Sequence, residues 1–464
     1  MCRIGGFGGI CLLSRSSERC GLRRSGNKLL DVYDRQNPRS PVQDVDFAPL
    51  ARALSQLPAL KHLSFTLEAT PPDVLLAAVG SAPHVDFLEF RNARFDGPSL
   101  VHHFVRMKLK ALTISVGLYR EANIDLDQEK RNIAEILTSL AEQLVQLEIS
   151  GDLVSFRVLE KISWPNLLAL RYTDNIPFGE ILPMSAVVAL MPRLRTLGYY
   201  FSAAPQFYKP GVIFCSKNEN CSSLLSTTHP DLQKLTMSNI VSGDAIFDQL
   251  PAALRVLRVL ALRDDLRNGE GREMPLYPYF PISHRDAFRI INKAGHLRHL
   301  VELAITLEDC PSPDLLSAVA DSCRGLRILE LTQGMYDLNR EESPYTMKSL
   351  AQPLKPLKFL YDLRITVWFG PQKAPFRRHA TRLEVRTGIT AAAEVFAEIL
   401  PQLATISFSL TNISRYDGTR HPLTWYYLVV HDSLDGHRPV AEFDGYREYY
   451  SHSASFKDYS IRSP

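Results

Sequence analysis

A short apolar phrase recurs along this chain and predicts a series of short strands. The phrase has the form Leu-x-x-Leu-x-Φ, in which Φ is apolar and other apolar residues sometimes replace Leu. Its second and third anchors are two residues apart, so both side chains point to the same side of an extended chain. The anchor triplets are Leu60-Leu63-Phe65, Val85-Leu88-Phe90, Leu109-Leu112-Ile114, Leu144-Leu147-Ile149, Leu167-Leu170-Tyr172, Leu194-Leu197-Tyr199, Leu232-Leu235-Met237, Leu257-Leu260-Leu262, Leu300-Leu303-Ile305, Leu326-Leu329-Leu331, Leu360-Leu363-Ile365 and Leu403-Ile406-Phe408.

The spacing of these twelve copies identifies the repeat. Central anchors of consecutive copies lie either 23–27 or 34–43 residues apart. The short interval fits a leucine-rich repeat, which takes about 20–29 residues, and the long interval fits the same unit with an inserted loop. We expect such loops at 201–224, 263–282, 333–346 and 369–382.

Helices are expected between the phrases. Several of these segments begin with a serine or proline and carry an apolar stripe at helical spacing. We predict helices at 72–79, 127–143, 283–293, 313–320 and 390–399. The predicted fold is therefore an α/β leucine-rich-repeat solenoid, a horseshoe with parallel strands on the concave face and helices on the convex face.

The repeats divide the chain into three parts. Residues 1–44 are expected to be a disordered or mis-assigned leader, with a transit peptide or secretory signal as the alternatives. Residues 45–410 hold about twelve irregular repeats. Residues 411–464 are expected to form a capping hairpin and tail, because a β-prone run starts at Trp425 and a turn signal follows at Asp435-Gly436. A cap would shield the last repeat.

Side chains that flank the anchors should face the concave surface and are the candidate binding residues. In the position after the third anchor, nine of the twelve residues are Ser or Thr. Two interpretations stay open, a solvated strand that favours small polar residues and a polar groove that binds an extended partner. The candidate protein-binding residues are Glu89, Arg91, Glu148, Arg171, Tyr200, Arg263, Glu330 and Arg364.

Composition excludes several classes of function. The 53 basic and 50 acidic residues give a net charge of +3, so no global field favours nucleic acid or an anionic membrane. No apolar run reaches the about 18 residues of a membrane span. The seven cysteines are scattered and show no Cys-x-x-Cys pair, which favours reduced thiols and a cytoplasmic or nuclear location.

The sequence also lacks the usual signs of catalysis. It contains no nucleophile elbow, phosphate-binding loop, dinucleotide fingerprint or zinc-protease helix. His421, Asp432 and Ser433 have the residue types of a triad, but nothing in the sequence fixes their geometry. We therefore predict a non-enzyme, without cofactor or metal, that acts as a monomer and binds an unidentified protein.

The chain resembles a known family. The relevant segments are 165–172 (PNLLALRY), 192–199 (PRLRTLGY), 230–237 (PDLQKLTM) and 425–436 (WYYLVVHDSLDG). Over residues 45–445 they are similar to the F-box and leucine-rich-repeat proteins of mushroom-forming fungi. The resemblance implies a substrate receptor that binds the adaptor subunit of an SCF-type ubiquitin ligase.

Other functions remain open beside this one. The Leu-Pro-x-Glu-Ile-Leu opening of an F-box does not occur between Met1 and Asp44. The main alternative is a stand-alone leucine-rich-repeat binding protein without a ligase partner. An extracellular sensing protein and a regulator of small GTPases are further alternatives built on the same fold.

Overall fold

The computed structural model describes most of the repeat region. The described residues are 20–25, 29–34, 52, 54, 60–67, 69–82, 84–98, 100–116, 124–175, 187–202, 214–215, 224–262, 281–333, 345–367, 382–413, 420–432 and 439–448. The chain divides into two compact units, Met1–Leu197 and Gly198–Pro464. Each unit is described by itself.

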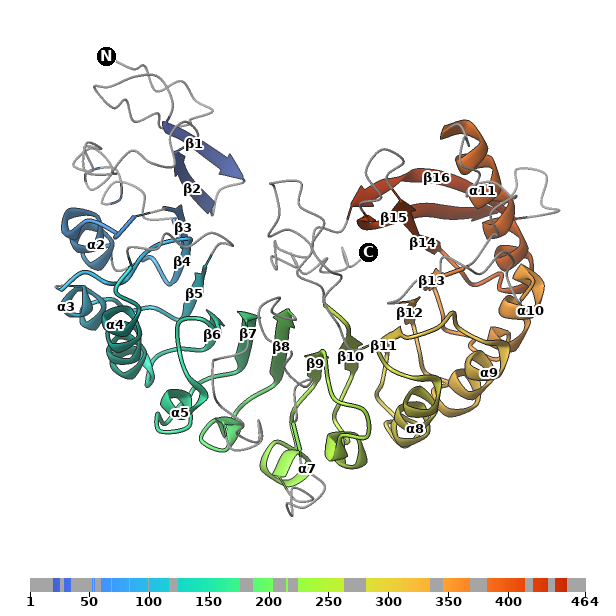
Figure 1. Cartoon of the computed structure of the whole chain (residues 1–464), viewed down its shortest axis with the longest axis horizontal. Helices are drawn as coiled ribbons and strands as arrows, with labels where there is room; N and C mark the ends of the chain where they lie inside the picture. The colour runs from blue at the N-terminus through green and yellow to red at the C-terminus, as the bar shows by residue number, and fades with distance from the viewer. Residues whose placement is uncertain are drawn as a thin grey trace. The chain divides into compact units, whose positions relative to one another are not determined.

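The first unit is a sheet whose strands follow the sequence order, with its helices on one side (Figure 1). Its first two strands form an antiparallel pair, and every later pair is parallel. The strands are β1 (Cys20–Ser25), β2 (Leu29–Asp34), β3 (His62–Thr66), β4 (Phe87–Arg91), β5 (Ala111–Ser115), β6 (Gln146–Ser150) and β7 (Ala169–Asn175). The helices are α2 (Asp73–Gly80), α3 (Val101–Val105), α4 (Leu126–Leu140) and α5 (Phe156–Leu159).

Two of these strands lie inside the segment for which a leader was predicted. β2 pairs in parallel with β3 and places Leu30 opposite Leu63 and Val32 opposite Phe65. β2 thus extends the ladder of anchor positions by one strand beyond the twelve phrases. That residues 1–44 are a disordered or mis-assigned leader stays a prediction.

The second unit repeats the arrangement and ends in antiparallel strands (Figure 1). Strands β9 to β14 are parallel, and β15 pairs antiparallel with both β14 and β16. The strands are β9 (Lys234–Ser238), β10 (Val256–Leu260), β11 (Glu302–Leu307), β12 (Ile328–Gln333), β13 (Asp362–Thr366), β14 (Thr405–Ile413), β15 (Arg420–Asp432) and β16 (Pro439–Glu448). The helices are α7 (Leu224–Thr228), η4 (Ala245–Gln249), α8 (His284–Ala294), α9 (Pro313–Ser322), α10 (Met347–Ala351), η5 (Gln352–Leu354) and α11 (Arg382–Ile399). Strand β8 (Thr196–Ser202) spans the division between the units.

The anchor residues form the core of each unit. In the first unit Leu63, Leu88, Leu112, Leu147 and Leu170 lie opposite one another in consecutive strands, and none is more than 1% exposed. Burying such a side chain contributes about 1.5–3 kcal/mol, so the ladder supplies much of the driving force for folding. Parallel strands and helices that alternate in this way confirm the α/β leucine-rich-repeat architecture.

One predicted register was wrong. Leu257 lies opposite both Leu235 and Leu303, so the anchors of β10 are Leu254, Leu257 and Val259. The segment contains two overlapping Leu-x-x-Leu phrases, and burial favours the earlier one because Leu254 and Leu257 are fully buried. Leu260, the predicted central anchor, is only half-buried and takes the position after the third anchor.

The turn after the strand explains several Asn and Asp residues. Asn92, Asp174 and Asn239 each stand two residues after a third anchor and have φ of 61°, 67° and 51°. Short polar side chains tolerate this left-handed conformation better than other non-glycine residues. The buried Asn239 also donates from its amide to the carbonyls of Phe201 and Leu262, at 2.9 Å each.

The longer predicted helices occur near their expected places. Ser283 and Ser312 cap α8 and α9 by accepting from the backbone of Asp286 and Leu315, at 3.2 Å each. α11 begins eight residues before its predicted start at Thr390. α3, α5, α7 and α10 have only four or five residues each, too few for a periodic signal, and were not predicted.

Candidate functional site

The face of the sheet opposite the helices is the candidate binding surface, and we call it the strand face. In each repeat it displays three positions, one before the second anchor, one between the second and third, and one after the third. Side chains alternate along a strand, so all three positions share a face. The sequence prediction included the second and third positions and missed the first.

The serine and threonine residues after the third anchor are largely buried, in contrast to the prediction. Ser150, Ser238 and Ser409 are 0% exposed. Strands lie about 4.8 Å apart, so a small side chain is covered by its neighbours in adjacent strands. The hydroxyls bond within the sheet instead, as between Thr332 and Thr306 at 3.1 Å. These positions stabilise the sheet and do not form a solvated groove.

Charged residues on the first unit's strand face are held in place by their neighbours. The Glu89 carboxylate accepts from Arg91 Nε at 2.7 Å and lies 3.5 Å from His62 Nε2. The His62 ring stacks on Phe87, with centroids 3.7 Å apart. Burial opposes ionisation of Glu89, but the adjacent His62 ring and the hydrogen bond from Arg91 prevail and hold its pKa at about 2. Glu89 is therefore a fixed negative charge at physiological pH.

A second ion pair lies further along the same unit. Arg171 Nη1 on β7 is 3.4 Å from Glu148 Oε2 on β6. The Glu148 side chain is 19% exposed, and burial raises its pKa although the nearby Arg171 guanidinium opposes the increase. Glu89 adds a smaller repulsion. The pair thus presents a partly shielded carboxylate beside an accessible guanidinium.

The second unit carries a chain of charges across β10 to β13. Arg258 Nε contacts Glu302 Oε1 at 2.6 Å, and Arg364 contacts Glu330 at 3.3 Å and Asp362 at 2.7 Å. Burial works against the charged form of Arg258, but Glu302 and Glu330 outweigh it and raise the guanidinium pKa. Among the described residues, three carboxylates face two guanidinium groups, an excess of one negative charge.

The structure describes seven of the eight predicted site residues. Glu89 and Arg91 are in contact, as are Glu148 with Arg171 and Glu330 with Arg364. Tyr200 is half-buried on β8 and adds to the electrostatic environment of Arg258. Arg263 lies outside the described residues, and the corrected register of β10 gives its predicted position to Leu260.

Sequence reasoning missed four residues of these clusters. His62, Glu302 and Asp362 stand before the second anchor, a position that strand alternation alone would have included. Arg258 was missed because of the register error at β10. The available signal was the leucine at 254, which begins the competing phrase.

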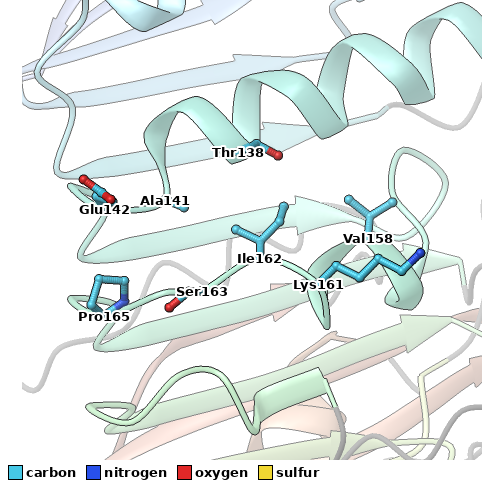
Figure 2. Close-up of a pocket in the computed structure, with 8 residues that line it drawn as sticks. All are labelled: Thr138, Ala141, Glu142, Val158, Lys161, Ile162, Ser163 and Pro165. Atoms are coloured by element: carbon cyan, nitrogen blue, oxygen red, sulfur yellow. The ribbon is translucent and has the colours of Figure 1, made fainter.

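A shallow hollow of about 480 Å³ lies on the helix side of the first unit (Figure 2). It is formed by the C-terminal end of α4 and by α5 with the segment that follows. Its lining includes two charged groups, Glu142 and Lys161, but no histidine or cysteine. The lining therefore offers no pairing of a nucleophile with a histidine base.

The described part of the chain offers neither a metal-binding cluster nor a membrane-spanning helix. Among these residues no three His, Cys, Asp or Glu side chains gather closely enough to hold a metal ion. No described helix is long and apolar enough to cross a membrane.

Comparison with known proteins gives distant structural neighbours. No family model and no curated protein sequence matches this chain. Among solved structures, an internalin from Listeria monocytogenes, InlF, is 12% identical over 69% of this chain and 82% of its own, with a TM-score of 0.36. A structure of the Drosophila Toll–Spätzle complex is similar at 14% identity over 77% of this chain and 57% of that chain, with a TM-score of 0.29.

Proposed function

We propose that this chain is a non-catalytic scaffold that recognises another protein through its strand face. The observation that carries the proposal is the set of charges placed across neighbouring strands of each unit. Glu89, Arg171, Arg258 and Arg364 belong to ion pairs that are neither fully buried nor fully exposed. Such groups are already oriented and partly desolvated, so a partner orders few additional side chains on binding.

The signs of these charges favour a protein as the ligand. Carboxylates and guanidinium groups lie within a few ångströms of each other, as in the run of Arg258, Glu302, Glu330 and Arg364. A protein surface can present both signs in a matching order, and this complementarity gives specificity more than raw affinity. A uniform polyanion would meet repulsion from the carboxylates.

The context that we propose is substrate recognition in an SCF-type ubiquitin ligase, in the cytoplasm or nucleus. This finer proposal rests on the resemblance to F-box and leucine-rich-repeat proteins. Its test is co-expression of the full chain with the SCF adaptor subunit, followed by size-exclusion chromatography. Co-elution at one-to-one stoichiometry would support the ligase role. Separate elution of two folded proteins would favour the alternative, a stand-alone binding protein.

The strand face itself is tested by exchanging the members of one ion pair. The variant R258E/E302R keeps an ion pair but reverses its polarity. A control, D248R/R289E/K293E, reverses the charges of a helix-side group in the same unit, in which Asp248 lies 2.7 Å from Arg289 and 3.3 Å from Lys293. Partners are captured with the wild-type chain and identified, and their affinity is then measured for all three proteins.

The expected result is a loss of at least about tenfold in affinity for the strand-face exchange and little change for the control. A charge-pair exchange that left every captured partner bound with wild-type affinity would contradict the proposed function. Thermal unfolding of both variants checks that the fold is kept.

A further inference from the structure

A row of exposed cations lies along one edge of the second unit. Before each of the strands β10 to β13 the chain makes a turn, and these four turns carry positive but no negative side chains. The turns are 251–255, 295–301, 323–327 and 355–361, and none contains Asp or Glu. Their cations are all exposed, and we call them the basic edge: Arg255, Arg298, Arg324, Arg327, Lys355 and Lys358.

The repeat itself aligns these residues. The N–H of Val301 donates to the carbonyl of Arg255, and the N–H of Tyr361 donates to that of Arg327, at 2.9 and 3.0 Å. The N–H of Arg327 donates in turn to the carbonyl of Val301, at 2.8 Å. Arg255, Val301, Arg327 and Tyr361 therefore hold one position in four consecutive strands.

A second row runs beside the first. Arg298, Arg324 and Lys358 each stand two residues before a first anchor, in turns closed by the same hydrogen bond from the anchor N–H to the carbonyl three residues earlier. Neighbouring members of this row are thus about one strand spacing, roughly 5 Å, apart along the edge. Within the described part of the chain, none of these three cations forms an ion pair with a carboxylate.

An apolar residue completes this surface. Phe359 lies between Lys358 and the buried Leu360, and 64% of it is exposed. A phenylalanine so exposed loses contact with water when a partner covers it, which adds hydrophobic to electrostatic stabilisation. The aligned cations and the exposed ring together offer a partner both charge and apolar surface at one edge.

We propose that the basic edge, together with Phe359, binds an acidic segment of a partner protein that carries an apolar residue beside its acidic tract. The edge spans four strands, roughly 14 Å, which an extended peptide covers with about four or five residues. The adjoining cluster of Glu302, Glu330 and Asp362 has an excess of negative charge and would repel a continuous polyanion. A peptide can place its acids on the edge and other residues near the cluster, which favours a protein over nucleic acid.

The probe is a short peptide of about four glutamates with one leucine beside them, which matches the length of the edge, and the binder is the full-length chain. The variant R298E/R324E/K358E reverses one row of the edge. The matched control K130E/R285E/K348E makes the same change in charge at three exposed cations on α4, α8 and α10. Affinity for the labelled peptide is measured by fluorescence anisotropy at low and at physiological salt.

The expected result is a loss of about tenfold or more in affinity for the edge variant, with the control within about twofold of the wild type. F359S is expected to weaken binding of the leucine-containing peptide but not of plain oligoglutamate. If the reversed variant does not fold, R298Q/R324Q/K358Q replaces it, with a smaller loss expected.

Two outcomes would overturn the proposal. Equal weakening by the edge variant and the control would mean that the peptide responds only to total charge. Tighter, edge-dependent binding of oligothymidylate or phosphatidylserine vesicles than of the peptide would assign the edge to another class of ligand. Neither outcome bears on the strand face, because the probe and the substituted residues are different from those that test the proposed function.

Discussion

Two tyrosines at the same repeat position differ in whether their hydroxyls are bonded, and this predicts opposite effects of one substitution. Tyr172 and Tyr199 are third anchors of β7 and β8 and are 0% and 1% exposed. The Tyr172 hydroxyl donates a hydrogen bond to the carbonyl of Val154. The Tyr199 hydroxyl has no partner among the described residues, and its ring packs against Phe201 and Phe214.

The magnitudes follow from the cost of unpaired polar groups. Tyr172→Phe removes a buried hydrogen bond and deprives the Val154 carbonyl of this donor, which costs about 1–3 kcal/mol. Tyr199→Phe removes a buried hydroxyl that gains nothing in the folded state, and the variant should be more stable by about 1–2 kcal/mol. Burial also raises the pKa of Tyr199, so the hydroxyl stays protonated and ionisation does not offset the cost of burying it.

The assay is urea denaturation of both variants, with hydrogen exchange of peptides from β7 and β8 as a local measure of opening. Exchange is needed because a repeat protein with two units can unfold in more than one step. We expect faster exchange near β7 in Tyr172→Phe and slower exchange near β8 in Tyr199→Phe. Destabilisation by Tyr199→Phe of more than about 1 kcal/mol would refute the reasoning, since it would require a partner for that hydroxyl.

Four further predictions concern single positions. The pKa of Glu89 is about 2 in the folded chain against 4.5 ordinarily, so ionised Glu89 stabilises the fold fully above pH 4.5. Up to about 3 kcal/mol of this free energy of unfolding is lost as the pH falls toward 2. Glu89→Gln should abolish this part of the pH dependence in acid denaturation curves. Burial raises the pKa of the Cys323 thiol to about 12, so iodoacetamide should label it far more slowly in the native chain than in urea, and equal rates would count against its burial. In urea denaturation, Leu257→Ala should lower the free energy of unfolding by about 2–5 kcal/mol and Leu260→Ala by clearly less. A larger loss for Leu260→Ala would indicate that Leu260 is the central anchor after all. Asn239→Ala should lower the free energy of unfolding by about 2–4 kcal/mol, because it removes both amide hydrogen bonds. Asn239→Gly should be about 1 kcal/mol more stable than Asn239→Ala, because glycine adopts the positive φ without strain. Equal stability of the two variants would exclude a backbone contribution.

The repeat phrase was sufficient to predict the fold. The period of two within a strand and the spacing between phrases both follow from backbone geometry, so the ladder from Leu63 to Leu170 could be predicted from anchors alone. The phrase did not decide the register at β10, because Leu254 and Leu257 begin equally good copies. The pairing with Leu235 and Leu303 and the burial of Leu254 resolve that choice.

The candidate site was less predictable than the fold. Glu302 is paired with Val256 and Arg258 with Ala304, so the contact between Glu302 and Arg258 is diagonal and depends on the side-chain directions as well as on the strand register. The burial of Ser238 and Ser409 was mispredicted for a related reason, since exposure of a small side chain depends on the size of its neighbours. Such properties belong to pairs of strands and are not visible in one phrase.

The most direct test of the central claim is photo-crosslinking from the strand face to a captured protein partner. A photoreactive amino acid is placed at Gln146 or Lys234, which are exposed on that face, and at Glu135 or Lys348, which are exposed on helices. The account predicts crosslinks from the two strand positions and few from the helices. Crosslinks from the helix positions alone would contradict the assignment of the strand face as the recognition surface.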